Sequence, residues 1–65
     1  MKITVNGEAQ ETSANTLSAL LIELGKGEAK VATSVNEIFV PKTSRADTPV
    51  NDGDRIEIVA PRQGG

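Results

Sequence analysis

Polar and apolar residues alternate near both ends of the chain with the period of a half-buried β-strand. The alternating stretches are residues 2–6 and 55–59. In each of them one face carries β-branched apolar residues, which are Ile3 and Val5 in the first stretch and Ile56 and Ile58 in the second. Because these are the two most regular strand patterns, we expect the strands to lie side by side at the centre of one sheet.

A hairpin is predicted directly after the first strand. Asn6-Gly7 is a strong hairpin signal, because both central positions of a type I′ turn need a positive φ. Residues 8–12 then return as a second strand. Their polar character suits an edge strand that must resist pairing with other chains.

A second strand pair is predicted in the middle of the chain. Residues 31–35 and 38–40 are the two strands, with Asn36 and Glu37 as a tight connection between them. Pro41 ends the pair because proline cannot donate to a β-ladder.

One amphipathic helix is predicted between the two strand pairs. Its apolar stripe recurs at i, i+3, i+4 and i+7 and consists of Leu17, Leu20, Leu21 and Leu24. We expect Asn15, or alternatively Ser13, to cap its N-terminus, and Gly25 to form a left-handed cap at its end. Ile22 lies off the stripe, so it either wraps the sheet edge or is exposed. A helix this short is unstable alone in water and must pack on the sheet.

The segment before the last strand is polar and is predicted to be irregular. Residues 42–49 wrap around the domain, and Val50 is their expected anchor to the core. The charged side chains of this segment are interpreted as solvated, namely Lys42, Arg45 and Asp47.

A turn over residues 51–54 follows, with Gly53 supplying a positive φ. Asp52 and Asp54 flank this glycine. Two acids beside a turn glycine serve the turn more often than they bind a metal, so no metal site is predicted.

The order of elements predicts an α+β fold, with a mixed sheet of four to five strands and one main helix packed across one face. The 65 residues make a single domain, 1–65, in which we expect residues 61–65 to be a flexible C-terminal tail. The chain has no cysteine, and Phe39 is its one aromatic residue. We therefore expect a well-packed core that includes Phe39.

Charge and composition exclude several classes of function. The net charge is −2, with both signs scattered along the chain, whereas a nucleic-acid surface would show clustered Lys and Arg. No apolar stretch approaches the length of a membrane span, and no signal peptide is predicted. Together with the lack of cysteine, these features lead us to expect a cytoplasmic protein without nucleic-acid or membrane partners.

The group with the clearest potential for covalent chemistry is the α-carboxylate of Gly65. The chain has neither histidine nor cysteine, so common nucleophiles and metal ligands are missing. Gly64 and Gly65 have no Cβ, so they form a thin thread that can enter a narrow tunnel. A frayed tail explains a terminal Gly pair equally simply, so the rest of the chain must decide.

Three motifs stand in order along the chain. They are the opening 3–7 (ITVNG), the middle Val35-Asn36 followed by residues 39–41 (FVP), and the closing 52–58 (DGDRIEI) with terminal Gly-Gly. Together they resemble the ThiS family of sulfur carriers. The resemblance covers essentially the whole chain and implies a β-grasp, ubiquitin-like fold. The chain is also similar to MoaD, the small subunit of molybdopterin synthase, and more remotely to Urm-type modifiers. Ile38 departs from the commonest family pattern, in which a small or polar residue is expected.

The resemblance implies a reaction at the chain end. A ThiF-like adenylating enzyme would activate Gly65 with ATP, and a cysteine desulfurase would supply sulfur to form a thiocarboxylate. Thiazole synthase, ThiG, would then take that sulfur into the thiazole of thiamine. The carrier would be a protein-bound substrate and not an enzyme, with no cofactor of its own.

Two groups of residues are expected to meet these partners. Arg62, Gln63 and Gly64 would enter a partner's active site with the tail. Val59 and Ile38 are apolar where alternation points them outward, so we expect a docking surface on the sheet face away from the helix. Single exposed apolar residues are common, so either one alone is weak support.

Two other functions stay open. The same carrier chemistry could serve molybdopterin synthesis or the conjugation of the chain to proteins as a modifier. Alternatively, the chain could be a β-grasp binding module without a covalent role, although a chain ending at Gly-Gly disfavours a fused module.

Overall fold

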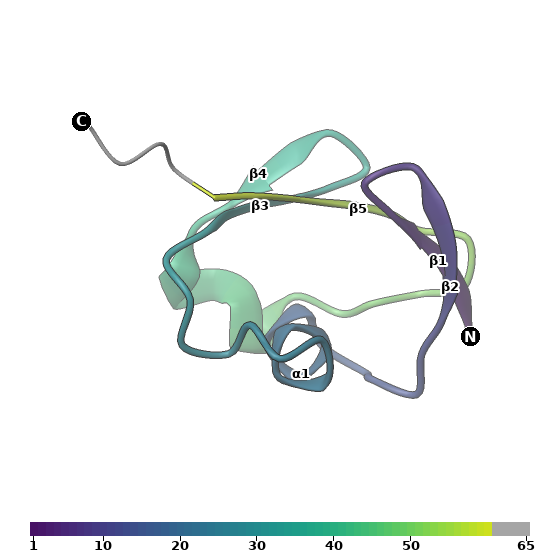
Figure 1. Cartoon of the computed structure of the whole chain (residues 1–65), viewed down its shortest axis with the longest axis horizontal. Helices are drawn as coiled ribbons and strands as arrows, with labels where there is room; N and C mark the ends of the chain where they lie inside the picture. The colour runs from purple at the N-terminus through teal and green to yellow at the C-terminus, as the bar shows by residue number, and fades with distance from the viewer. Residues whose placement is uncertain (61–65) are drawn as a thin grey trace.

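Five strands form one mixed sheet, and the helical segments lie on one side of it (Figure 1). The computed structural model describes residues 1–60. The strands are β1 (Lys2–Val5), β2 (Glu8–Glu11), β3 (Ala32–Val35), β4 (Ile38–Val40) and β5 (Arg55–Val59). Three of them, β1, β2 and β3, are one residue shorter than predicted.

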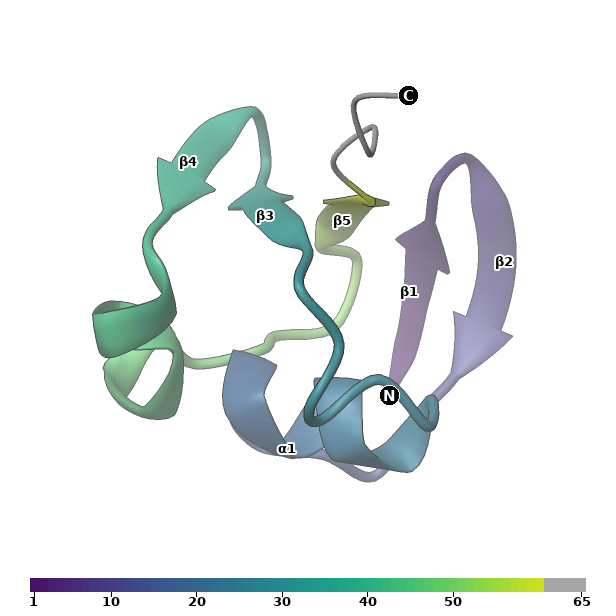
Figure 2. The same ribbon diagram turned by 60° about the vertical axis from the view of Figure 1, so that its left-hand side comes forward.

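The strand order is β2-β1-β5-β3-β4, which Figure 2 shows across the sheet. β1 and β5 are parallel, whereas the other three pairs of neighbours are antiparallel. The predicted central position of the last strand beside the first is therefore confirmed. The polar strand β2 lies at the sheet edge, as its composition indicated.

Both predicted tight connections adopt left-handed backbone conformations. Asn6 and Gly7 have φ of 52° and 85°, and Asn36 and Glu37 have φ of 51° and 71°. The prediction of positive φ at Asn6 and Gly7 is confirmed. Glu37 is unusual here, since left-handed conformations are costly for residues other than Gly, Asn and Asp.

The helix α1 spans Leu17–Glu23, and its N-cap is Thr16, so the predicted caps Asn15 and Ser13 are wrong. The Thr16 Oγ1 accepts a hydrogen bond from the Ala19 amide over 3.2 Å. The reason is tertiary: Asn15 O accepts from the Val50 amide, and Thr16 forms a bridge with Pro49. These contacts hold the chain extended through Thr16, so the helix begins only after it.

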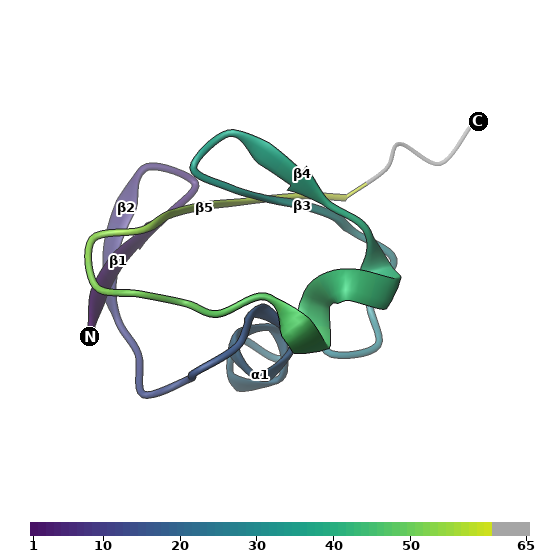
Figure 3. The ribbon, with the colours of Figure 1, turned by 180° about the vertical axis from the view of Figure 1, so that it is seen from behind.

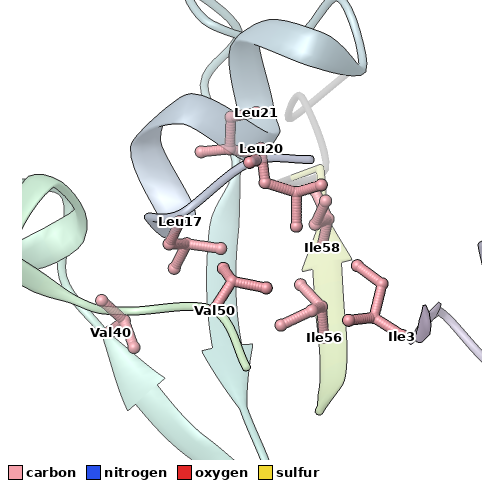
Figure 4. Close-up of a cluster of buried hydrophobic side chains, with 9 residues drawn as sticks. Ile3, Leu17, Leu20, Leu21, Val40, Val50, Ile56 and Ile58 are labelled. Atoms are coloured by element: carbon pink, nitrogen blue, oxygen red, sulfur yellow. The ribbon is translucent and has the colours of Figure 1, made fainter. Parts of the chain in front are cut away.

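Nine apolar side chains form the core between the sheet and the helix (Figure 4). The helix contributes three leucines of the predicted stripe, and Leu20 lies beside Ile58 of β5 in Figure 4. The members are Ile3, Ala14, Leu17, Leu20, Leu21, Val40, Val50, Ile56 and Ile58. Leu24 is only partly buried. Ile22 is 67% exposed, so of its two predicted alternatives, wrapping the sheet edge or being exposed, the second is correct.

Phe39 lies outside this core, contrary to our expectation. It is 66% exposed, because Thr33 pairs with Val40 and Ser34 pairs with Phe39 across the β3–β4 ladder. Thr33 and Val40 are buried, so Phe39 must point to the opposite face. The core is accordingly built from aliphatic side chains.

The segment predicted to be irregular contains a 3₁₀ helix, η1, over Lys42–Asp47, which lies beside α1 (Figure 3). Val50 is 3% exposed, so its predicted role as an anchor is confirmed. Lys42 and Asp47 are exposed as interpreted, but Arg45 is only 8% exposed, and its interpretation as a solvated charge is wrong. Its guanidinium donates to Thr33 Oγ1 and to the Val31 carbonyl, which is why this residue is buried.

The two acids before β5 hold the turn together. Asp54 accepts hydrogen bonds from the Asn51 amide at 2.8 Å and from the Asn36 side chain at 3.1 Å. Asp52 accepts from the Lys2 amide at 2.7 Å, and Gly53 has φ of 87°. Their interpretation as turn residues is confirmed. No helix within residues 1–60 is long and apolar enough to cross a membrane.

Candidate functional site

The residues predicted to react or to enter a partner lie outside the described part of the chain. These are Arg62, Gln63, Gly64 and Gly65. The structure instead describes the strand that leads to them and the surfaces beside it. The site is therefore built here from β5 outward.

β5 is the central strand of the sheet, between β1 and β3. It pairs with β1 through Thr4–Arg55 and Val5–Ile56, and with β3 along its length from Val35–Ile56 to Ala32–Val59. Ile56 and Ile58 are buried beneath the helix, whereas Val59 faces the other way. The segment after Val59 thus starts from a strand that β3 pairs with up to its last residue, whereas β1 pairs only with Arg55 and Ile56.

The outer face of the sheet carries an apolar area around Val59. Val59 is 62% exposed and pairs with Ala32, while Phe39 projects from the next strand on the same face. Between them lies a shallow hollow of about 150 Å³, lined by Ala32, Thr33, Ser34, Phe39, Glu57 and Val59. We name this the outer patch, defined by Ala32, Phe39 and Val59. The predicted outward position of Val59 is confirmed.

Ile38 does not share this face, so that part of the expectation is wrong. Ile38 pairs with Val35, and Val35 pairs with the buried Ile56, which places the three in one row on the helix side of the sheet. Ile38 is nevertheless 70% exposed, because β4 is an edge strand beyond the reach of α1. It lines an open groove of about 410 Å³ between β4 and η1, together with Val35, Asn36, Phe39, Val40, Pro41, Ser44 and Thr48.

Phe39 is the residue of this area that sequence reasoning missed. In the apolar run 38–40, alternation alone allows either Phe39 or its two neighbours to face outward. The register with β3 decides, since Val40 must be buried with Thr33.

On the same face, charged side chains of β5 lie between the start of the strand and the outer patch. Arg55 forms an ion pair with Glu37 at 3.3 Å, and Glu57 accepts from the Ser34 hydroxyl at 3.3 Å. Both contacts are exposed, so they contribute little to stability. They do limit the apolar area to the end of the sheet where β5 finishes.

A comparison with family models decides the family of this chain, because the ThiS family model matches residues 3–65. The chain belongs to the ThiS family. The Sulfur carrier protein ThiS of Thermus thermophilus is 36% identical over 63 residues, which cover 97% of this chain and 98% of that protein.

Solved structures agree with the ThiS assignment. A crystal structure of the thiamine biosynthesis protein ThiS from Geobacter metallireducens superposes with a TM-score of 0.84 and 29% identity, over all of both chains. A solution structure of a thiamine biosynthesis protein from the same organism gives a TM-score of 0.79 and 28% identity, over all of this chain and 88% of the other. The predicted ubiquitin-like β-grasp fold is thereby confirmed.

A much longer relative has a higher sequence identity to this chain than the Thermus thermophilus protein. A protein named Thiazole synthase from Paramagnetospirillum magneticum is 52% identical over 66 residues. This chain is matched in full but spans only about one fifth of the length of that relative.

Proposed function

We propose that this ThiS-family chain is a sulfur carrier of thiamine biosynthesis that carries sulfur on the α-carboxyl carbon of Gly65. The observation that carries this proposal is the family match, which runs through residue 65 and so includes the terminal glycines. The relative from Thermus thermophilus, named as a sulfur carrier, matches over nearly its whole length and supports the same function.

The carboxylate must first be activated, because its negative charge repels nucleophiles and an oxide is a poor leaving group. In the proposed first step, a Gly65 carboxylate oxygen attacks the α-phosphorus of ATP and pyrophosphate leaves. The product is an acyl adenylate, in which AMP is a good leaving group. ATP is bound by the partner, a ThiF-like adenylating enzyme, and not by the carrier.

Sulfur then replaces AMP in two steps. The terminal sulfur of a persulfide, made by a cysteine desulfurase, attacks the Gly65 carbonyl carbon and AMP leaves. A thiol attacks the donor's sulfur, so that the S–S bond breaks and a new disulfide forms on the donor side. The carrier leaves as a thiocarboxylate, and the thiol supplies the two electrons.

The thiamine branch is favoured over the molybdopterin branch by one comparison. A sequence similar to this whole chain forms part of a protein named Thiazole synthase, which supports thiazole synthase, ThiG, as the enzyme that consumes the sulfur. In this proposal the carrier contributes no catalytic group and acts as a substrate for each partner in turn.

Docking would use exposed apolar residues of β5 and β4, with the tail entering the partner. Val59 on the outer patch and Ile38 at the edge of β4 are the proposed contacts, at 62% and 70% exposure. Because they lie on opposite faces of the sheet, one partner can contact both only by wrapping the β4 edge. Arg62, Gln63 and Gly64 would guide the tail into the active site.

Intact-mass measurement tests the proposal. The chain is incubated with the adenylating enzyme, ATP, a cysteine desulfurase, cysteine and a thiol reductant. We expect one oxygen-for-sulfur exchange, which fragmentation locates on Gly65. A variant that lacks Gly65 is expected to fold normally and to show no exchange.

Two outcomes would overturn the proposal. Sulfur found in the variant without Gly65 would place the reaction elsewhere on the chain. If the full chain never gains sulfur although the enzymes convert a known carrier, a non-covalent binding module becomes the better account.

A further inference from the structure

Both hairpin turns of the sheet place an asparagine against the central strand β5. Asn6 and Asn36 are each the first residue of their turn, with φ of 52° and 51°. The backbone N–H of Asn6 donates to the Ile56 carbonyl at 2.9 Å, and the backbone N–H of Asn36 donates to the Arg55 carbonyl at 2.7 Å. The turns thus extend the ladders on both sides of β5 by one residue.

The side chain of Asn6 extends its ladder further, toward the end of β5. Its Oδ1 accepts from the Ile58 amide at 2.9 Å, and its Nδ2 donates to the Ile58 carbonyl at 3.1 Å. The carboxamide therefore pairs with both backbone groups of one residue, as the N–H and C=O of a facing residue do in a hydrogen-bonded antiparallel pair. A type I′ turn favours asparagine for its backbone conformation, but that preference does not require this contact.

The side chain of Asn36 makes a similar contact at the opposite end. Its Oδ1 accepts from the Arg55 amide at 2.9 Å, and its Nδ2 donates to Asp54 Oδ1 at 3.1 Å. The two asparagines contact opposite ends of β5 because β1 and β3 run in opposite directions. β1 is parallel to β5, so the turn after β1 reaches the C-terminal half of β5, whereas β3 is antiparallel and its turn reaches the start.

We propose that Asn6 is a positioning residue for the reaction at the chain end, because its carboxamide fixes the last part of β5 from which the reacting segment departs. This inference rests on the proposed sulfur-carrier function. Beyond Val5, β1 gives β5 no further strand partner, and β3 holds only the other edge, through Ala32 and Val59. On the edge of β5 that has no strand partner at Ile58, the Asn6 side chain forms the hydrogen bonds that such a strand would form. Ile58 is next to the proposed docking residue Val59.

The expected effect is on binding by the partner and not on its chemical step. A strand end held on one edge samples more directions, and this freedom must be lost when the chain end is threaded into an active site. Once threaded, the carboxylate has the same position in either case. The KM for the carrier therefore rises while kcat stays unchanged.

Asn6→Gly is the test, with Asn36→Gly as its matched control. Glycine keeps the positive φ of each turn and removes two side-chain hydrogen bonds in each case. The two variants are thus expected to lose similar stability, while only Asn6→Gly releases the C-terminal end of β5. Asn6→Asp keeps the acceptor for the Ile58 amide but loses the donor, so it is expected to be intermediate.

Two readouts are compared with those of the unsubstituted chain. In Asn6→Gly, the Ile58 amide is expected to exchange about fivefold to tenfold faster, the factor that one ordinary hydrogen bond contributes. The KM of the adenylating enzyme for the carrier, followed by ATP–pyrophosphate exchange, is expected to rise by a similar factor at constant kcat. Asn36→Gly is expected to change neither the Ile58 exchange rate nor the KM.

The outcomes separate this inference from the proposed function. If the unsubstituted chain is activated and Asn6→Gly has the same KM as Asn36→Gly, Asn6 has only a role in the turn and the inference is wrong. A fall in kcat at constant KM in Asn6→Gly would also overturn it. If the unsubstituted chain is never activated, the proposed function fails, while the Ile58 exchange rates still decide whether Asn6 holds the strand end.

Discussion

Arg45 donates from Nε to Thr33 Oγ1 over 3.1 Å, and the same hydroxyl donates to the Val40 carbonyl over 2.9 Å. These two bonds join η1 to β3 and β4. A further guanidinium donor reaches the Val31 carbonyl, so the buried cation is satisfied by neutral oxygens. A polar bridge therefore closes the end of the core that the short helix α1 does not cover.

Arg45→Ala is expected to lower the free energy of unfolding by about 2–4 kcal/mol, because hydrogen bonds to a buried charged group are lost. Arg45→Lys should recover only part of this loss, since one ammonium lacks the fork that reaches both oxygens. Urea denaturation measures both values. Lys42→Ala, an exposed residue of the same 3₁₀ helix, is the control and should stay within about 0.5 kcal/mol of the parent. Equal stability of the Arg45 and Lys42 variants would contradict the bridge.

Leu20→Ala is expected to destabilise the domain by roughly 2–5 kcal/mol, because this side chain is 1% exposed and its removal leaves a cavity. Small domains have little stability to spare, so a large fraction of the protein could unfold. Thermal denaturation followed by circular dichroism measures the effect. Ile22→Ala, on the exposed side of the same helix, should melt close to the parent. Similar melting of both variants would mean that the leucine stripe does not face the core.

Thr16→Ala is expected to cost about 1 kcal/mol, the usual value for a lost N-cap hydrogen bond. Asn15→Ala, one residue earlier, should change the stability by less than about 0.5 kcal/mol, because only its backbone carbonyl contacts Val50. Chemical denaturation of the two variants provides the comparison. A larger loss for Asn15→Ala would restore the cap that the sequence alone favoured.

Val59→Asp and Ile38→Asp are expected to weaken binding to the adenylating enzyme by about tenfold or more, since each buries a charge in an apolar contact. The fold should be retained, because both residues are exposed. Ile22→Asp places the same charge on the helix and serves as the control. Calorimetric titration gives the affinities. Unchanged affinity for both sheet variants would move the interface elsewhere.

Local patterns in the sequence were sufficient for most of the fold. The alternation in residues 2–6 and 55–59, the Asn6-Gly7 turn and the leucine stripe each depend on residues that are close in sequence. The structure contains all of them, although β1 ends at Val5 and Leu24 is only partly buried. The turn acids Asp52 and Asp54 were interpreted correctly for the same reason. Of the candidate site, only the outward position of Val59 followed from such a pattern; the reactive role of Gly65 came from the family resemblance and stays a proposal.

The burial of Arg45, the exposure of Phe39 and the start of the helix at Thr16 could be decided only by the tertiary structure. Arg45 is buried because Val31 and Thr33, more than ten residues earlier, present oxygens to it. The register with β3 decides which of Ile38 and Phe39 lies on the outer face, and a shift of one residue would exchange them. Asn6 illustrates both sources: the sequence determined its turn, but its contact with Ile58 exists only because β5, fifty residues later, lies parallel to β1.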